Sequence, residues 1–136
     1  MVIIPQNTDL ALIITLTDIN NNPLNLKLLS GLGIWLTYSN DIPFLKYGLN
    51  NIAVDDTNLS EEGFIPIKIV NAVLGQVKII VEAKNTVNAS LGVLDMHIKV
   101  QYTSKDTTTG QWHNTSEPLK SWGKIVNSVS SGTTNL

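Results

Sequence analysis

The sequence contains no cysteine and no arginine. The lack of cysteine excludes disulfide bonds, a thiolate nucleophile and any metal site with sulfur ligands. Arginine provides the forked donor group that binds phosphate and guanine, and the nine basic residues, all lysines, form no basic stripe in its place. With a formal net charge of −2, the chain is not expected to bind nucleic acid.

Charged residues are also scarce. They make up 15% of the chain, against about 25% in typical soluble domains, while 43% of the residues are hydrophobic. A surface with few charges is easier to bury against a partner. No apolar run approaches the roughly 20 residues of a membrane span, and the N-terminus MVIIPQNTD lacks the basic region and long apolar segment of a signal peptide. We therefore expect a protein that is made in a cytoplasm and does not contact membranes.

A chain of 136 residues suits one domain with a sizeable core. Its clearest pattern lies in the stretch 74–104, where apolar and polar residues alternate before and after the loop 86–90. Because side chains alternate across a strand, two strands are predicted here, each with one buried face, at the centre of the sheet. The predicted inward residues are Val77, Ile79, Val81 and Ala83 in the first strand and Leu94, Met96, Ile98, Val100 and Tyr102 in the second.

Shorter strands are predicted along the rest of the chain, at 9–17, 34–38, 44–47, 51–54, 64–70 and 111–115. Turns rich in Asn, Gly and Pro separate them, and the stretch 24–32 fits a strand, a helical turn or both in succession. Pro66 marks its strand as an edge strand, because proline cannot donate to a central ladder. About seven short strands without a long helix predict an all-β sandwich.

A turn near the N-terminus carries a weak calcium signal. Asp18, Asn20 and Asn22 match the opening of an EF-hand loop. Such a loop next requires a glycine, where Pro23 stands, and later a bidentate glutamate, where Leu29 stands. We therefore interpret this segment as a turn in which Asp and Asn bond to their own backbone.

A second candidate metal site lies on the predicted strand after residue 91. Asp95 and His97 share its wet face, and side chains two residues apart on a strand can ligate one ion. Zinc normally takes three or four protein ligands, and the other histidine, His113, has no carboxylate cluster beside it. We instead expect a solvated face whose charges pair with Lys78 and Glu82 across the strands, and no metal site.

Catalytic motifs are not apparent either. The sequence has no G-x-S-x-G motif and no glycine-rich phosphate loop. The acidic pairs Asp55–Asp56 and Glu61–Glu62 lie in a polar loop, where adjacent carboxylates are usually solubilising and do not form a glycosidase pair. We expect neither an enzyme nor a cofactor.

A different class of function rests on three aromatic residues. Tyr102, Trp112 and His113 are candidates for a platform that stacks on a sugar ring. A small carbohydrate-binding module is therefore the alternative function, and it predicts exposed Trp side chains. Ordinary core and edge packing is the other explanation of these residues.

The order of several motifs resembles a group of phage virion domains. Ile4-Pro5-Gln6-Asn7 leads into the first strand, and Thr17-Asp18 opens a turn that closes with Asn22-Pro23-Leu24-Asn25-Leu26. The strand 34–38, the strand after Gly63 and the long closing pair follow. Over residues 1–104 the chain resembles the immunoglobulin-like N-terminal domain of phage baseplate upper proteins and of related tail and head-fibre proteins. In that family the turn commonly reads T-D-x-x-G-x-P-x-D-L, and asparagines stand here for its glycine and its acidic residue.

This resemblance implies an antiparallel immunoglobulin-like β-sandwich of about seven strands with terminal arms, and a structural role as a rigid module that docks other proteins. We accordingly expect a non-enzymatic bacteriophage protein of the virion, in a tail, baseplate or capsid-accessory position. Its expected partners are other virion proteins and further copies of itself, with no nucleic acid and no membrane.

The two chain ends are expected to act as arms, although the segment 2–4, which Pro5 ends, also fits an edge strand. The expected sandwich domain covers residues 1–118, with an arm at its start, and a C-terminal arm or tail covers 119–136. Each end holds apolar residues without an evident partner of similar length, and exposed apolar groups of this size mark contact sites. We predict that at least one end packs on a neighbouring subunit; in the alternative, both fold back on their own sandwich. The expected partner-binding residues are Val2, Ile3, Ile4, Trp112, Trp122, Ile125 and Val126.

Overall fold

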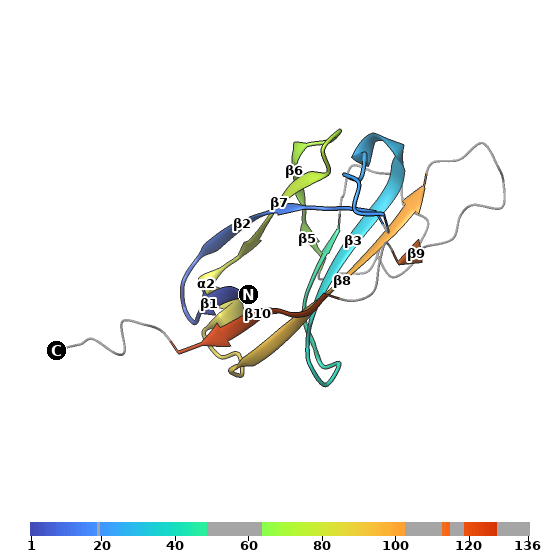
Figure 1. Cartoon of the computed structure of the whole chain (residues 1–136). Helices are drawn as coiled ribbons and strands as arrows, with labels where there is room; N and C mark the ends of the chain where they lie inside the picture. The colour runs from blue at the N-terminus through green and yellow to red at the C-terminus, as the bar shows by residue number, and fades with distance from the viewer. Residues whose placement is uncertain (19, 49–63, 103–112, 115–118, 128–136) are drawn as a thin grey trace.

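The computed structural model describes residues 1–18, 20–48, 64–102, 113–114 and 119–127. Two β-sheets form most of this part of the protein, which confirms the all-β prediction (Figure 1). The larger sheet contains, in spatial order, β1 (Val2–Pro5), β10 (Leu119–Val126), β8 (Gly92–Tyr102), β3 (Leu29–Tyr38), β4 (Pro43–Gly48) and β5 (Ile65–Pro66), with β9 (His113–Asn114) also paired to β8. The smaller sheet has the order β2 (Leu10–Thr15), β7 (Gln76–Val81) and β6 (Lys68–Asn71).

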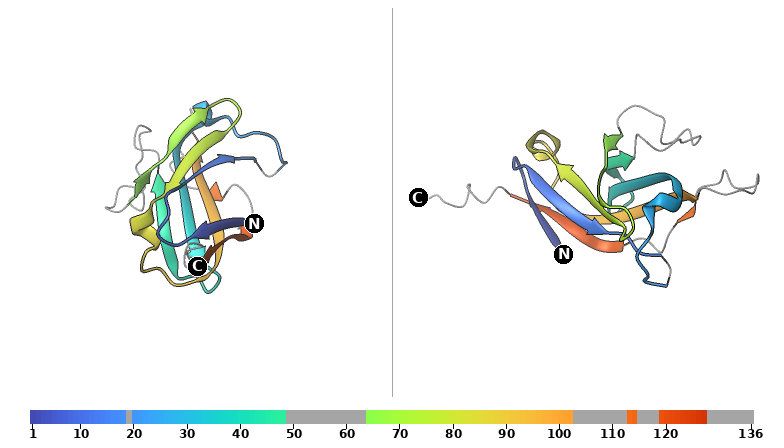
Figure 2. Two further views of the ribbon diagram at one scale, coloured as in Figure 1. Left: turned by 90° about the vertical axis from the view of Figure 1, so that its left-hand side faces the viewer. Right: turned by 90° about the horizontal axis from the view of Figure 1, so that it is seen from above.

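The strand directions differ from the expectation at two edges. Most neighbours are antiparallel, but β1 runs parallel to β10 and β4 runs parallel to β5. The two further views in Figure 2 show the sheets as separate layers of the molecule. The antiparallel arrangement expected for the whole sandwich therefore does not extend to the two edges of the larger sheet.

The main hydrophobic core lies between the two sheets. The larger sheet contributes Leu32, Ile34, Leu36, Met96 and Val100, and the smaller sheet contributes Val77 and Ile79. The hydroxyl of buried Tyr47 on β4 donates a hydrogen bond of 2.9 Å to the Ile80 carbonyl on β7, which links the sheets directly. The predicted inward faces of β7 and β8 are confirmed at these core residues, while Ile98 is half-buried at the edge of the core.

The two strands of the stretch 74–104 are not neighbours, contrary to the prediction. β7 is the middle strand of the smaller sheet, and β8 is an interior strand of the larger one. The first strand also ends at Val81, where a helical turn, α2 (Ala83–Thr86), begins. Glu82 and Asn85 form a reciprocal capping box around this turn, and it redirects the chain from one sheet to the other.

The ambiguous stretch 24–32 contains both predicted structures in succession. The Asn25 side chain accepts a hydrogen bond from the Lys27 backbone and caps a 3-10 turn, η1 (Leu26–Leu28). β3 then starts at Leu29 and passes through Gly31 and Gly33, so it is longer than the predicted strand 34–38.

The Asp18 turn closes on its own backbone. One carboxylate oxygen of Asp18 accepts hydrogen bonds from the backbone of Asn20 at 2.8 Å and of Asn22 at 3.0 Å. Asn21 has a φ of 63°, a left-handed conformation that asparagine tolerates better than most residues. The interpretation of this segment as a turn is confirmed.

The predicted strand 64–70 is divided between the two sheets. β5 is an edge strand of the larger sheet, as Pro66 predicted, and β6 belongs to the smaller sheet. Ile67 between them is buried, whereas Ile69 is exposed although it was expected inside. The predicted strand 51–54, the acidic loop 55–63 and Trp112 lie outside the described residues.

Candidate functional site

The two chain ends form neighbouring strands of the larger sheet. β1 pairs with β10 over four residue pairs, from Val2 with Gly123 to Pro5 with Val126, and β10 in turn pairs with β8. The ends therefore provide the partners that neither segment offers within its own sequence. Because Leu119–Val126 is part of the sheet, the expected domain boundary after residue 118 and the expected C-terminal arm are wrong for these residues.

Burial decides which of the expected partner-binding residues are available to another protein. Ile4 and Ile125 are fully buried in a small cluster with Val81 and Leu94, so neither side chain can reach a partner. Trp122 is half-buried and packs against this cluster and the main core. Val2 and Val126 are half-buried, and Ile3 is 51% exposed. Within the described residues, the chain ends follow the alternative in which both fold back on their own sandwich, although at least one end was predicted to pack on a neighbouring subunit.

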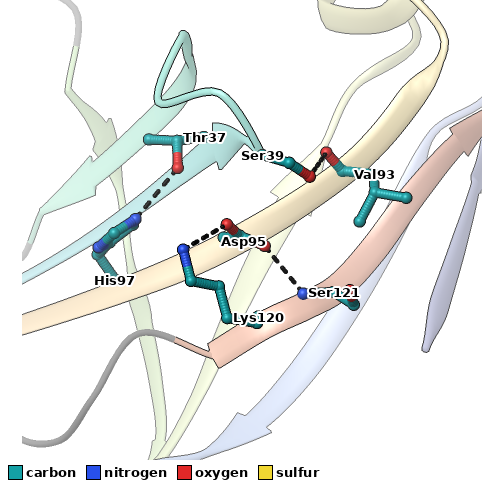
Figure 3. Close-up of polar contacts among 7 residues, drawn as sticks. All are labelled: Thr37, Ser39, Val93, Asp95, His97, Lys120 and Ser121. Atoms are coloured by element: carbon teal, nitrogen blue, oxygen red, sulfur yellow. Dashed lines mark hydrogen bonds and ion pairs between the residues drawn. The ribbon is translucent and has the colours of Figure 1, made fainter.

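Asp95 is the one charged side chain that is almost fully buried among the described residues, with 2% exposure, although its strand position predicted an exposed face. Its carboxylate accepts a hydrogen bond of 2.8 Å from the Ser121 backbone and one of 3.2 Å from the Lys120 ammonium (Figure 3). The register between β10 and β8 shifts at this point, and Ser121 has a φ of 53°. Asp95 therefore holds a β-bulge of the last strand in place.

The surroundings of Asp95 lower the pKa of its carboxyl group. The hydrogen bond from the Ser121 backbone lowers the pKa of the Asp95 carboxyl below its ordinary value of 3.8. Burial acts against this shift, and the positive charges of Lys120 and His97 add to it. The expected pairing with Lys78 and Glu82 is wrong, because those residues lie in or beside the smaller sheet.

His97 is engaged in the sheet rather than in a metal site. Its Nε2 atom lies 3.1 Å from the Thr37 hydroxyl on the neighbouring strand β3 (Figure 3). No group of three or more His, Asp or Glu side chains that could hold a metal ion occurs among the residues that the structure describes.

An aromatic cluster lies on the outer face of the larger sheet. The Trp35 ring meets the Phe64 ring edge-on at a centroid distance of 5.9 Å. The Lys99 ammonium lies 5.5 Å from the Trp35 ring centre, and the Lys46 ammonium lies 4.6 Å from the Phe64 ring centre. Trp35 also lines two surface hollows of about 350 and 210 Å³. Such a face can contact a protein or a sugar.

The sequence contained a signal for Trp35 that our prediction did not use. Trp35 alternates with Ile34 and Leu36 along β3, and both of these side chains are buried in the core. Alternation therefore places the indole on the opposite, outer face. Trp112, on which the predicted sugar platform depends, lies outside the described residues.

Among the described residues, the hairpin of β6 and β7 brings the most exposed large apolar side chains together in one short stretch. Ile69, Val70, Val73 and Leu74 are between 41% and 51% exposed, and they fall within six residues of chain. We call these four side chains the hairpin patch. Large apolar side chains that stand exposed together in one short stretch of chain are suited to contact with a partner.

The tip of this hairpin is held firmly against the rest of the protein. The Leu26 backbone donates a 2.8 Å hydrogen bond to the Ala72 carbonyl, and the Leu16 backbone donates one of equal length to the Gly75 carbonyl. Gly75 has a φ of +68°, and a Cβ atom here would lie 2.6 Å from the carbonyl oxygens of Leu16 and Leu24. Only glycine fits this position, so the hairpin patch is displayed on a fixed turn.

No helix in the described part of the chain has the length and apolar character needed to cross a membrane. Comparison with known proteins adds no relative: no protein-family model and no curated protein sequence matches this chain.

Proposed function

We propose that this protein is a non-enzymatic structural subunit that acts through protein–protein contacts in a bacteriophage particle, at a tail, baseplate or capsid-accessory position. The observation that carries the assembly role is the hairpin patch. Four exposed aliphatic side chains lie within six residues of a hairpin whose turn is anchored by backbone hydrogen bonds and by a glycine that no other residue can replace. Such a rigid apolar surface is suited to a partner that covers it.

The energetic gain from covering this patch is sufficient to anchor a contact. Burying a large aliphatic side chain completely is worth about 1.5–3 kcal/mol. Since each of the four is roughly half exposed, a partner that covers all of them gains on the order of 3–5 kcal/mol. This is the size of a small hot spot in a protein interface.

The strand order supports an immunoglobulin-like topology within this proposal. In such domains one sheet carries the order B-E-D, and the facing sheet carries G-F-C, extended by C′ in variable-type domains. Here the orders β2-β7-β6 and β10-β8-β3-β4 correspond to these when the strands are taken in chain order. The phage assignment itself rests on the resemblance of residues 1–104 to virion domains, and the absence of any cysteine departs from the disulfide of antibody domains.

The assembly role is tested with proteins encoded by the genes that flank this one. The double variant Val73→Ser/Leu74→Ser removes half of the hairpin patch, and Val87→Ser/Leu91→Ser is a matched control. These two control side chains are 47% and 49% exposed and lie beside α2, away from the hairpin.

Complex formation is measured for the wild type and both variants by size-exclusion chromatography with light scattering and by titration calorimetry. We expect the first variant to weaken binding at least about tenfold, in line with the loss of a hot spot, and the control to bind as the wild type does. Equal binding by both variants, or no complex with any of these proteins, would overturn the proposal.

The outer face of the larger sheet supports a second candidate function, glycan binding. Trp35, Thr37, Asp41, His97 and Lys99 line the hollow of about 210 Å³, which combines an indole with hydrogen-bonding groups suited to sugar hydroxyls. It ranks second because Lys99 and Phe64 already contact the Trp35 ring. Saturable binding on a glycan array that is lost on Trp35→Ala, while the Val73→Ser/Leu74→Ser variant still binds, would favour it.

A further inference from the structure

The edges of the two sheets are protected unequally. Unpaired strand edges invite pairing with other chains, and proteins usually protect them with short strands, Pro, Lys or bulges. In the larger sheet, β1 has four residues and ends in Pro5, and β5 has two residues, one of them Pro66. In the smaller sheet, β6 carries Lys68 and a shift in register. Only β2, at the other edge of that sheet, lacks all of these devices.

β2 is a regular and uncharged edge strand. It consists of Leu, Ala, Leu, Ile, Ile and Thr, and it pairs with β7 through six consecutive residues without a bulge. Among the residues that the structure describes, no strand pairs with its other side. It therefore offers a straight run of backbone donors and acceptors to another strand.

The direction of these backbone groups follows from one hydrogen bond. The Leu16 backbone donates to the Gly75 carbonyl at 2.8 Å, and this pair continues the register of β2 with β7. In an antiparallel ladder, residues that bond to the partner alternate with residues whose N–H and C=O groups point away from it. Since Leu16 bonds to the β7 side, Ala11, Ile13 and Thr15 direct their backbone groups to the open edge.

Ile13 is the most exposed large hydrophobic residue within the described strands. It lies at the middle of the three outward-directed residues and is 65% exposed. Its neighbours along the strand edge, Ala11 and Thr15, are small and uncharged. Only small, uncharged residues thus flank Ile13 at the open edge, so an identical strand can lie antiparallel to it with Ala11 of each copy opposite Thr15 of the other.

We infer that β2 pairs with β2 of a second copy of this chain, antiparallel and about a twofold axis at Ile13. Ile13 then faces Ile13 of the other copy, and Ala11 faces Thr15. These three pairs exchange about six hydrogen bonds, because each hydrogen-bonded antiparallel pair exchanges two. The smaller sheets of the two copies then turn their inner faces to the same side of the pair. These two three-stranded sheets therefore join into one continuous sheet.

The distribution of charge favours a second copy over a charged partner. On the outer face of the smaller sheet, Ile13 on β2 lies beside Lys78 on β7, and Lys78 lies beside Lys68 on β6. The twofold axis places the Lys78 residues of the two copies three strand spacings apart, about 14 Å. This exceeds the Debye length of about 8 Å at physiological salt, so the lysines do not oppose pairing at the uncharged seam.

This inference rests on the proposed assembly role, and the test uses a different surface from the hairpin patch. Ile13→Lys places a charge on the axis, and Ile42→Lys makes the same change in the turn before β4 of the larger sheet, outside both β2 and the hairpin patch, where Ile42 is 54% exposed. Sedimentation equilibrium measures self-association of the wild type and both variants. We expect a wild-type dimer, at least about 100-fold weaker association for Ile13→Lys because like charges meet, and no change for Ile42→Lys.

A covalent test uses the absence of natural cysteines. In the proposed pair the Cα atoms of the two Ile13 residues are about 5.5 Å apart, within the range of about 4.4–6.8 Å that a disulfide spans. Ile13→Cys should therefore form a disulfide-linked dimer under mild oxidation, and Ile42→Cys should not.

Several results would overturn the inference. They are a wild type that stays monomeric up to about 1 mM, equal effects of Ile13→Lys and Ile42→Lys, and equal crosslinking of the two cysteine variants. Failure of the proposed function appears separately, because Val73→Ser/Leu74→Ser affects only binding to other proteins. A wild type that dimerises normally but forms no complex with any of the proteins from the flanking genes would reject the proposed function and leave the β2 inference intact.

Discussion

The larger and the smaller sheet use their apolar residues differently. In the larger sheet the end strands β1 and β10 bury Ile4 and Ile125, and short strands containing Pro5 and Pro66 form its edges. The smaller sheet buries only its inner face and leaves Ile13 and the hairpin patch exposed. The larger sheet therefore acts as the scaffold of the domain, and the smaller sheet carries the surfaces that suit contacts with other proteins.

The largest expected effect separates the two faces of the smaller sheet. Ile79→Ala removes a fully buried side chain between the sheets and should lower the free energy of unfolding by about 2–5 kcal/mol. Ile13→Ala removes an exposed side chain and should change it by less than about 0.5 kcal/mol in the monomer. Urea denaturation at low protein concentration measures both. Similar losses for the two variants would mean that the faces are misassigned.

The next effect tests the larger sheet as a scaffold. Trp122 packs against both hydrophobic clusters from β10, so Trp122→Ala should cost about 2–4 kcal/mol of stability, somewhat less than for a fully buried aromatic. The thermal midpoint should fall accordingly. An unchanged midpoint would return Trp122 to the role of a free anchor for a partner, as the sequence first suggested.

A smaller effect comes from Asp95 and depends on pH. The pKa of its carboxyl is lowered in the folded protein, so the unfolded chain binds the proton at a higher pH than the folded one. The stabilisation is therefore complete above the ordinary pKa of 3.8 and is lost as the pH falls through the lower folded value. At pH 7, Asp95→Ala should cost about 1–3 kcal/mol, because the Ser121 backbone N–H loses its partner.

The pH dependence of this loss provides the control. In urea titrations between pH 7 and pH 2, the difference between wild type and Asp95→Ala should shrink towards the acidic end. A difference that stays constant over this range would show that the carboxylate charge plays no part in holding the bulge.

The smallest expected effect on stability belongs to the hairpin patch. Val73→Ser/Leu74→Ser changes two side chains that are already half exposed, so the free energy of unfolding should move by less than about 0.5 kcal/mol. Thermal melts of this variant and of Val87→Ser/Leu91→Ser should coincide. A clear loss in the first variant alone would mean that these side chains support the fold instead of awaiting a partner.

Part of this fold was predictable because alternation is a local property. The buried residues Val77, Ile79, Leu94, Met96 and Val100 follow from period-two patterns alone. Alternation does not say which strands become neighbours, and so β7 and β8 were wrongly paired. The pairing of β1 with β10 joins segments more than 100 residues apart, and no local pattern encodes it.

The candidate sites likewise include features that local alternation predicts and features that depend on strands distant in sequence. Trp35 could be placed on the outer face from its alternation with Ile34 and Leu36. The burial of Asp95 could not be predicted, because it arises from the bulge at Ser121 on a strand distant in sequence. The exposure of Ile69 results from the passage of the chain between the sheets at Ile67, which no period-two pattern signals.

The parallel pairing of β1 and β10 also determines how the domain responds to mechanical force. Val2 lies beside Gly123, Pro5 lies beside Val126, and the Gln6 backbone donates a 3.0 Å hydrogen bond to the Val126 carbonyl. A pull applied to the chain before Val2 and after Val126 draws the two strands past each other lengthwise. All hydrogen bonds between them are then loaded at once, whereas bonds in a peeled hairpin break one after another. The scaffold sheet thus resists tension along the chain most strongly where its first and last strands meet.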